Sequence, residues 1–358
     1  YDGAIVKHRY YHYDGLNELV REDNQESNQT VLYTYDNGGN ILNKKIYPYT
    51  TGTPTGTPQT ITYSYGDSLW KDKLSSYNGQ SITYDAIGNP RTYRDGMSFT
   101  WEHGRQMKSF TNSAGATFEY SYDENGYRTG KKVGNTTYRY MLDGSRVVSQ
   151  SSYLGQMWYY YDANGQLVAL TSPTGEMYYY YFNAMGDVLG LYDQAGNVVA
   201  RYGYDAWGKL LSVKDGSGNI LTPTTDSTHI GILNPFRYRG YFYDDESGLY
   251  YLNSRYYDPQ TGRFVNSDSI LVLDNLLGTN LYAYCANDPV NNIDANGFAH
   301  QTIKKGAKGS EVRLLQAFLK RFGYRDQNGN DLVIDGDFGA KTDFALRNYQ
   351  RDFGLTPD

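Results

Sequence analysis

Aromatic and polar residues alternate along most of the chain, and short turn motifs interrupt the alternation at frequent intervals. The segment Phe118–Tyr122 is an example, with Glu119 and Ser121 standing between its aromatic residues. Alternation with a period of two is typical of a half-buried β-strand. The pattern therefore predicts many short strands joined by tight turns over residues 1–233.

The turns share one motif, in which an aromatic run ends in Tyr-Asp and Gly follows three residues after Asp. Asp accepts hydrogen bonds from the backbone ahead of it, and Gly takes the left-handed conformation that the turn needs. Each copy predicts a β-hairpin, and hairpins that are marginal alone become stable when they stack. The copies are Tyr35-Asp36 before Gly39, Tyr84-Asp85 before Gly88, Tyr122-Asp123 before Gly126, Tyr161-Asp162 before Gly165, Tyr192-Asp193 before Gly196, and Tyr204-Asp205 before Gly208.

The periodicity changes from two to 3.6 residues near Gln301, which predicts helices. A first helix is expected from Ser310 to Gly323, with an apolar face of Val312, Leu315, Leu319 and Phe322. A second helix is expected after the loop 335–339 and before Gly354, with Phe344, Ala345, Leu346 and Tyr349 as its apolar positions. The sequence therefore predicts a mainly β chain, built from spiralling antiparallel hairpins, with a small all-α C-terminal module.

Composition agrees with this architecture and limits the classes of function. The chain has 40 Tyr and 39 Gly among 358 residues; Tyr favours strands, and Gly supplies the positive φ of tight turns. The net charge of −6 argues against non-specific nucleic-acid binding, which needs a basic surface. No run of 18 apolar residues is present, so we expect no membrane-spanning helix.

The sequence predicts no cofactor and no metal site. The five His residues and the single Cys285 form no ligand cluster. His8 and His12 are four residues apart, but a strand would separate them by about 13 Å, too far for one metal ion. No Gly-rich stretch precedes a helical pattern as a phosphate-binding loop requires. Packing within the hairpin stack, rather than a sugar platform, is the role we expect for Trp70, Trp101, Trp158 and Trp207.

The recurring motif resembles the Tyr-Asp (YD/RHS) repeat family over roughly residues 1–300. In that family the hairpins spiral into a hollow β shell that can enclose a toxin polypeptide. Residues 234–298 resemble the RHS-repeat-associated core, which plugs one end of the shell and in some members cuts its own chain after its closing motif. The matching motifs are Asn234-Pro-Phe-Arg-Tyr-Arg-Gly240, Arg255-Tyr-Tyr-Asp-Pro259, Gly262-Arg-Phe264 and Asp294-Ala-Asn-Gly-Phe298.

The resemblance also implies a cleavage site of two aspartates and one arginine. Matched motif by motif, these fall on Arg255, Asp268 and Asp294. Two carboxylates held close together cannot both ionise easily, so one can activate water while the protonated other polarises the scissile carbonyl. Such a site would make the chain at most a single-turnover autoprotease. The alternative is that these aspartates are ordinary turn residues, which is the role we expect for Asp258.

The sequence departs from the family pattern around this site. The closing motif has Ala295 where the family has Pro and Phe298 where it has Leu, and Ser269 rather than Pro follows Asp268. The loss of Pro removes a fixed φ that helps to shape a loop. The scissile bond is expected between Phe298 and Ala299.

Residues 303–358 resemble a three-helix peptidoglycan-binding domain. The matching stretches are Lys305-Gly306, Gly309-Ser310-Glu311-Val312, Leu315-Gln316, Asp335–Gly339, Lys341-Thr342, Ala345-Leu346 and Tyr349-Gln350. The resemblance implies binding to peptidoglycan or another cell-wall glycan without chemistry. That family continues through a further turn, so we expect the module to be cut short at Asp358. Because Tyr1 falls within a repeat, we also expect that sequence precedes it.

Three functional hypotheses are open at this point. The first is the structural shell of a secreted or cell-surface bacterial protein that carries or presents a C-terminal effector. The second is a wall-anchored surface binding protein or adhesin without a toxin, and the third is the targeting part of a cell-wall hydrolase. The expected partners are a wall glycan and an enclosed effector polypeptide, with no nucleic acid and no membrane span.

Overall fold

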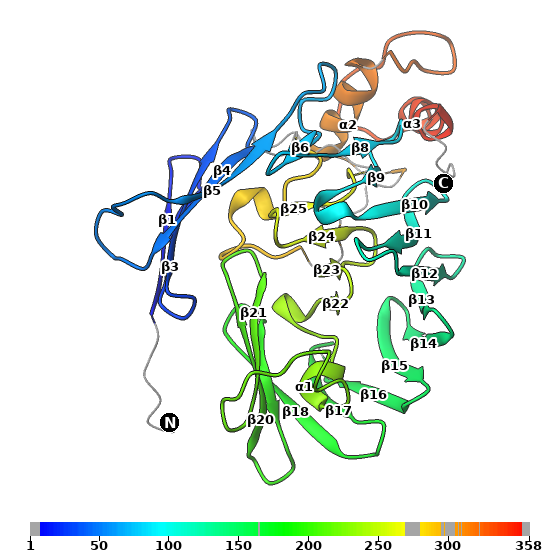
Figure 1. Cartoon of the computed structure of the whole chain (residues 1–358). Helices are drawn as coiled ribbons and strands as arrows, with labels where there is room; N and C mark the ends of the chain where they lie inside the picture. Colours follow the sequence, from blue (N-terminus) through cyan, green and yellow to red (C-terminus); the bar gives the residue numbers. More distant parts are fainter. Residues whose placement is uncertain are drawn as a thin grey trace.

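A computed structural model describes residues 8–268 except 164, residues 280–294 and 297, and residues 305–352 except 307, 309 and 322. The strands of these residues form three separate antiparallel sheets. Figure 1 shows the two large sheets curving around the small third sheet, with two helices beside the strands β6 to β10. The predicted class, a mainly β fold of antiparallel hairpins with a small helical module, is confirmed.

In each sheet the strands lie in chain order, so neighbours in sequence are hydrogen-bonded neighbours in space. The first sheet contains β1 (Arg9–Tyr13), β2 (Leu19–Asn24), β3 (Gln29–Tyr35), β4 (Ile41–Pro48), β5 (Gln59–Ser64), β6 (Ser76–Tyr77) and β7 (Gln80–Ser81). The second contains β8 (Thr83–Tyr84), β9 (Pro90–Thr92), β10 (Ser98–Glu102), β11 (Gln106–Thr111), β12 (Thr117–Tyr122), β13 (Arg128–Val133), β14 (Thr136–Asp143), β15 (Arg146–Ser152), β16 (Gly155–Tyr161), β17 (Leu167–Thr171), β18 (Met177–Phe182), β19 (Val188–Tyr192), β20 (Val198–Tyr204) and β21 (Leu210–Asp215). The third contains β22 (Phe242–Asp244), β23 (Leu249–Tyr251), β24 (Tyr256–Asp258) and β25 (Arg263–Phe264).

The Tyr-Asp motif forms the turns that the sequence predicts. In the first copy, the backbone N–H groups of Gly38 and Asn40 donate to Oδ1 of Asp36 at 2.8 and 2.9 Å. Gly39, with φ 73°, donates its N–H to the Asp36 carbonyl oxygen at 3.1 Å. The same Gly-to-Asp bond recurs at Asp85, Asp123, Asp162, Asp193, Asp205 and Asp215.

The Tyr of the motif has a role that the turn argument does not reveal. In five of the six copies the ring packs in or against the core, while the hydroxyl donates to a backbone carbonyl oxygen 10 to 16 residues earlier in the chain. A hydroxyl buried without a partner would cost free energy, so this bond lets the ring be buried. The pairs, at 2.6–3.1 Å, are Tyr35 with Leu19, Tyr84 with Leu74, Tyr122 with Met107, Tyr161 with Val147, and Tyr204 with Val188.

Buried ion pairs join the third sheet to the second. Nε of Arg94 lies 2.7 Å from Oδ2 of Asp258, and Nη1 of Arg128 lies 2.5 Å from Oδ2 of Asp244. All four side chains are almost fully buried. Around them, one hydrophobic cluster combines residues of all three sheets. The third sheet is therefore fixed inside the curve of the second by charge as well as by apolar packing.

The first sheet contacts the last hairpin of the second sheet through a buried glutamate. The N–H of Ala206, in the β20–β21 turn, donates to Oε1 of Glu22 on β2 at 3.0 Å. Burial, with a further contribution from the Asp205 charge, raises the pKa of Glu22 to about 7. Nearby, burial lowers the pKa of Lys44 to about 8. The ring centroids of Tyr33 and Trp207 lie 6.0 Å apart, so an aromatic contact also joins the two sheets.

The C-terminal module has its own small core of Leu319, Leu332 and Ala345. Of the apolar positions expected on the second helix, Ala345 is buried in this core, whereas the side chain of Phe344 is 38% exposed. Phe322 and Gly354 lie outside the described residues. None of the helices in the described ranges is long and apolar enough to cross a membrane. The helices are α1 (Ile230–Leu233), α2 (Ser310–Arg321) and α3 (Ala340–Asp352), with 3-10 turns η1 (Arg94–Gly96), η2 (Tyr238–Gly240) and η3 (Cys285–Asn287).

Candidate active site

The structure brings the three predicted site residues together. Nη2 of Arg255 lies 3.0 Å from Oδ2 of Asp268 and 3.3 Å from Oδ2 of Asp294. Their exposed fractions are 3%, 5% and 6%. One guanidinium nitrogen therefore bridges two carboxylates in a nearly dry environment, where charge interactions are much stronger than in water.

Local structure fixes Arg255 in this position. It precedes β24 in the tight β23–β24 hairpin, where Asn253 has φ 61°. Its guanidinium carbon lies 3.4 Å from the centroid of the Phe264 ring, and its Nη1 donates to the carbonyl oxygen of Leu281 at 3.3 Å. Stacking on the ring and bonding to the backbone leave the planar group little freedom.

Each aspartate is held by its backbone. The N–H of Asp268 donates to the Leu281 carbonyl oxygen at 2.8 Å, and the N–H of Asp294 donates to the Tyr241 hydroxyl at 3.1 Å. The chain just after Asp294 also reaches the arginine, because Nε of Arg255 donates to the carbonyl oxygen of Gly297. Gly297 has φ 74°, and a Cβ there would lie 2.5 Å from the Leu252 carbonyl oxygen. Glycine is therefore required at this point of the closing motif.

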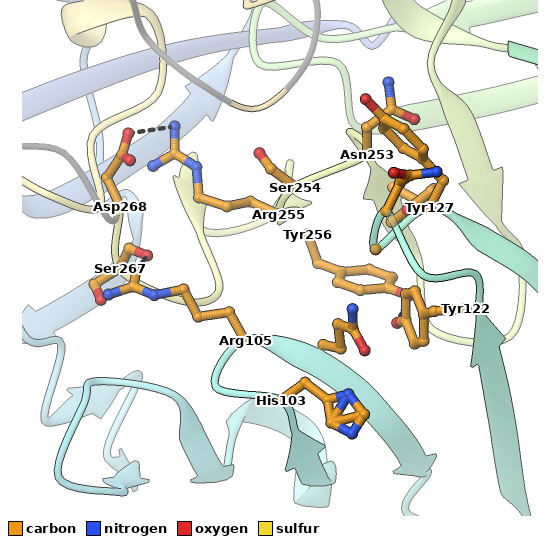
Figure 2. Close-up of a pocket in the computed structure, with 14 residues that line it drawn as sticks. His103, Arg105, Tyr122, Tyr127, Asn253, Ser254, Arg255, Tyr256, Ser267 and Asp268 are labelled. Atoms are coloured by element: carbon orange, nitrogen blue, oxygen red, sulfur yellow. Dashed lines mark hydrogen bonds and ion pairs between the residues drawn. The ribbon is translucent and has the colours of Figure 1, made fainter. Parts of the chain in front are cut away.

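A cavity of about 260 Å³ opens beside Arg255 and Asp268. Figure 2 shows Arg105, Ser267 and Asp268 at one side of the cavity, and Tyr122, Tyr127 and Tyr256 at another. Its volume is ample for several water molecules, and its lining offers the polar groups that ordered water needs. The site therefore combines two carboxylates, a fixed cation and room for a nucleophilic water.

The predicted scissile bond, between Phe298 and Ala299, lies outside the described residues. Asp258, expected as a turn residue, does accept the N–H of Gln260 at 3.0 Å. Its carboxylate also pairs with Arg94, a contact that the sequence did not indicate.

The shell contributes a residue that the sequence did not single out. Arg105, in the β10–β11 turn, donates from Nη1 to the carbonyl oxygen of Ser267, the residue before Asp268. Tyr349 of α3 lies within electrostatic reach of Arg105 and Asp268, and burial raises its pKa. No sequence motif links these residues, because they come from separate parts of the chain.

The other candidates lie apart from this site. Trp207 is completely buried, whereas Trp158 is 38% exposed on β16. Among the described residues, no group of three or more His, Cys, Asp or Glu side chains could hold a metal ion.

The C-terminal module carries an open groove along α3. Phe344, Asn348 and Arg351 line it from the helix, and Tyr324, Arg325 and Asp326 line it from the facing loop. Away from the groove, Nε2 of Gln316 donates to Oδ1 of Asp335 at 2.7 Å and to Oγ1 of Thr342 at 3.1 Å. Asp335 and Thr342, which match the peptidoglycan-binding family in sequence, therefore have a structural role: they join the loop and α3 to Gln316 of α2.

Solved structures show the same fold. The chain superposes on a structure of the Photorhabdus luminescens Tc holotoxin pore with a TM-score of 0.60 and 20% identity, covering 83% of this chain and 15% of that one. A crystal structure of TcdB2-TccC3 gives a TM-score of 0.58 and 20% identity, covering 81% of this chain and 16% of that one.

Two family models match, Teneurin YD-shell over residues 5–290 and a peptidoglycan binding domain over residues 308–358. The tRNA nuclease WapA of Bacillus subtilis (strain 168) is 35% identical over 296 residues, which cover 80% of this chain and 12% of WapA. Double-stranded DNA deaminase toxin A of Burkholderia cenocepacia (strain H111) is 26% identical, over 81% of this chain and 22% of the toxin. The predicted resemblance to YD-repeat proteins with a peptidoglycan-binding-like tail is confirmed, and the chain belongs to the Teneurin YD-shell family.

Proposed function

We propose that this chain is the shell and plug of a secreted or cell-surface bacterial protein that carries a C-terminal effector, and that it cuts itself between Phe298 and Ala299. The observation that carries the proposal is the bridge from Nη2 of Arg255 to both Asp268 and Asp294. Two separate aspartates meeting one buried arginine beside a cavity is an arrangement that turn formation alone does not require.

The architecture supports a role as a container. The third sheet, part of the predicted plug, is clamped inside the second by Arg94 and Arg128. Relatives that share this region are named as a tRNA nuclease and a DNA deaminase toxin, and the chain spans 12% and 22% of their lengths. A toxic polypeptide is therefore the class of effector that we propose.

The proposed reaction is hydrolysis of one peptide bond. A water in the cavity gives a proton to the charged carboxylate of the pair and attacks the Phe298 carbonyl carbon, while the protonated carboxylate hydrogen-bonds the carbonyl oxygen. The C–N bond to Ala299 then breaks, and the leaving nitrogen takes a proton from the pair. Arg255 keeps the carboxylates in place and holds the Gly297 carbonyl next to the scissile residue.

Intact-mass analysis of the purified chain tests this proposal. Wild type should give two fragments that end at Phe298 and begin at Ala299, and Asp268→Asn and Asp294→Asn should stay intact. Asp193→Asn is the matched control, since its carboxylate serves an exposed repeat turn. A wild-type chain that stays intact after native purification would overturn the cleavage proposal.

We also propose that the module binds cell-wall glycopeptide through the groove on α3. Phe344 offers an exposed ring for a sugar face or an alkyl side chain, and Arg325 and Arg351 offer charges for peptide carboxylates. Co-sedimentation with insoluble peptidoglycan should retain the wild type, and Phe344→Ala should weaken retention. Val333→Ala, also exposed in the module but outside the groove, should not.

If Phe344→Ala and Val333→Ala are retained equally on peptidoglycan, the groove is not the binding site. A chain that binds the wall but is never cut would instead support a wall-anchored surface binding protein without a toxin.

A further inference from the structure

The aspartate site lies where the plug meets the shell, and a shell hairpin reaches it. Arg105 follows a tight turn in which His103 has φ 46° and Gly104 has φ 83°. From this turn its Nη1 donates to the carbonyl oxygen of Ser267. Oγ of the same serine donates to the carbonyl oxygen of Ile87, in another shell turn, at 3.1 Å. Two shell turns thus hold the residue before Asp268.

Arg105 also faces the charges of the site. Its guanidinium is within electrostatic reach of Asp268, Arg255, Tyr282 and Tyr349. Within the described part of the chain, its Nε is buried and has no hydrogen-bond partner. A buried guanidinium N–H without a partner costs free energy, because the group would be better solvated in water. The fold therefore holds the Arg105 charge beside the site at a cost in stability.

Contacts from both the plug and the shell hold the backbone at Asp268. Arg255 holds its carboxylate at 3.0 Å, and the Leu281 carbonyl accepts its N–H at 2.8 Å, both from within the plug. The carbonyl of Ser267 belongs to the same peptide unit as the Asp268 N–H, and its oxygen accepts a hydrogen bond from Arg105 of the shell. The backbone leading into Asp268 is therefore clamped from both components.

We propose that Arg105 is a positioning residue of the aspartate site, so that the site is complete only when the β10–β11 hairpin of the shell has docked onto the plug. This rests on the proposed cleavage and adds a condition to it. A misplacement of a reacting group by about 1 Å can slow a reaction on the order of 100-fold. An undocked plug would then keep its chain intact, and cleavage would follow assembly of the shell.

The test compares cleavage in Arg105→Met, Arg105→Lys and Arg201→Met, each in the full chain. Refolding from denaturant starts the reaction, and intact mass follows it. Arg201→Met is the matched control, because Nη1 of Arg201 also donates to a backbone carbonyl oxygen, that of Gly216 at 2.8 Å, far along the sheet. In parallel, hydrogen exchange of the peptide containing Asp268 is measured with every variant in an Asp294→Asn background.

Arg105→Met should slow cleavage about 10- to 100-fold, Arg105→Lys should recover part of the rate, and Arg201→Met should match the wild type. Exchange of the Asp268 N–H should be faster in Arg105→Met alone. Unchanged cleavage and exchange in Arg105→Met would overturn the proposal. If the wild type is never cut, the proposed cleavage fails, and exchange still decides whether Arg105 positions Asp268.

Discussion

Replacing Arg94 with Met removes one partner of a fully buried ion pair between shell and plug. Nε and Nη2 of Arg94 donate to the two carboxylate oxygens of Asp258 at 2.7 and 2.8 Å. Asp258 has no exposed surface and Arg94 is 4% exposed. Met keeps the apolar stem but leaves a buried carboxylate without its counter-ion. Loss of one partner of such a pair costs about 3–5 kcal/mol, which is the expected fall in the free energy of unfolding.

Urea denaturation followed by Tyr and Trp fluorescence measures this loss, with the exposed Arg91→Met on β9 as the matched control. Burial disfavours the Asp258 carboxylate, but the Arg94 guanidinium outweighs burial and lowers the pKa of Asp258. The pair's contribution is therefore present above the ordinary carboxyl pKa and is lost as pH falls through the lowered value. The double variant Arg94→Met/Asp258→Asn should recover part of the stability. A loss under about 1 kcal/mol at neutral pH, or one that does not shrink in acid, would refute the reasoning.

Three further predictions use the same denaturation assay. Tyr161→Phe should cost about 1–2 kcal/mol because it leaves a backbone carbonyl without its hydroxyl donor, whereas the exposed Tyr160→Phe should stay within about 0.5 kcal/mol; equal losses would contradict the role given to the hydroxyl. Gly208→Ala should cost more than about 3 kcal/mol, because a Cβ would lie 2.4 Å from a buried tyrosine ring. Gly218→Ala, with a similar φ but open space, should cost only about 1–3 kcal/mol of backbone strain. Burial raises the pKa of Glu22 in the folded chain to about 7, against an ordinary 4.5. The stability that the protonated Glu22 gives the folded state is therefore present in acid and is lost as pH rises to about 7, and the free energy of unfolding falls by about 3 kcal/mol over that range. Glu22→Gln should therefore be less sensitive than the wild type to a change from about pH 5 to about pH 8, and an unchanged sensitivity would count against this account.

The hairpins could be predicted because their causes are local. The Asp carboxylate, the Gly conformation and the alternating strand residues act within a few positions of one another, as at Asp36 and Gly39. The two helices of the tail follow from local periodicity in the same way. Periodicity identifies Phe344 as an apolar position of the helix, but it cannot show whether another element covers the side chain, which is 38% exposed.

Contacts between distant segments could not be predicted from the sequence. Asp258 was expected to begin a turn, and it does, but its main partner Arg94 lies 164 residues earlier. Arg105 reaches the plug in the same way, 162 residues before Ser267. The meeting of Arg255 with both aspartates was expected from family motifs rather than from spacing. Whether they cut the chain stays a prediction.

The preference for Tyr over Phe in the repeats follows from the shape of the fold. A sheet that curves around a plug buries aromatic rings on its inner face. Backbone carbonyl groups at the starts of its strands also need hydrogen-bond donors. The hydroxyl of Tyr161 or Tyr204 donates to a carbonyl oxygen of the preceding strand, so one residue fills the core and ties neighbouring strands together. Apolar packing of this kind tolerates small shifts, whereas the Arg94 and Arg128 pairs accept one position of the plug. Tyrosine rings thus build the curved sheet, and the buried ion pairs set the position of the plug in which Asp268 faces Arg105 of the shell.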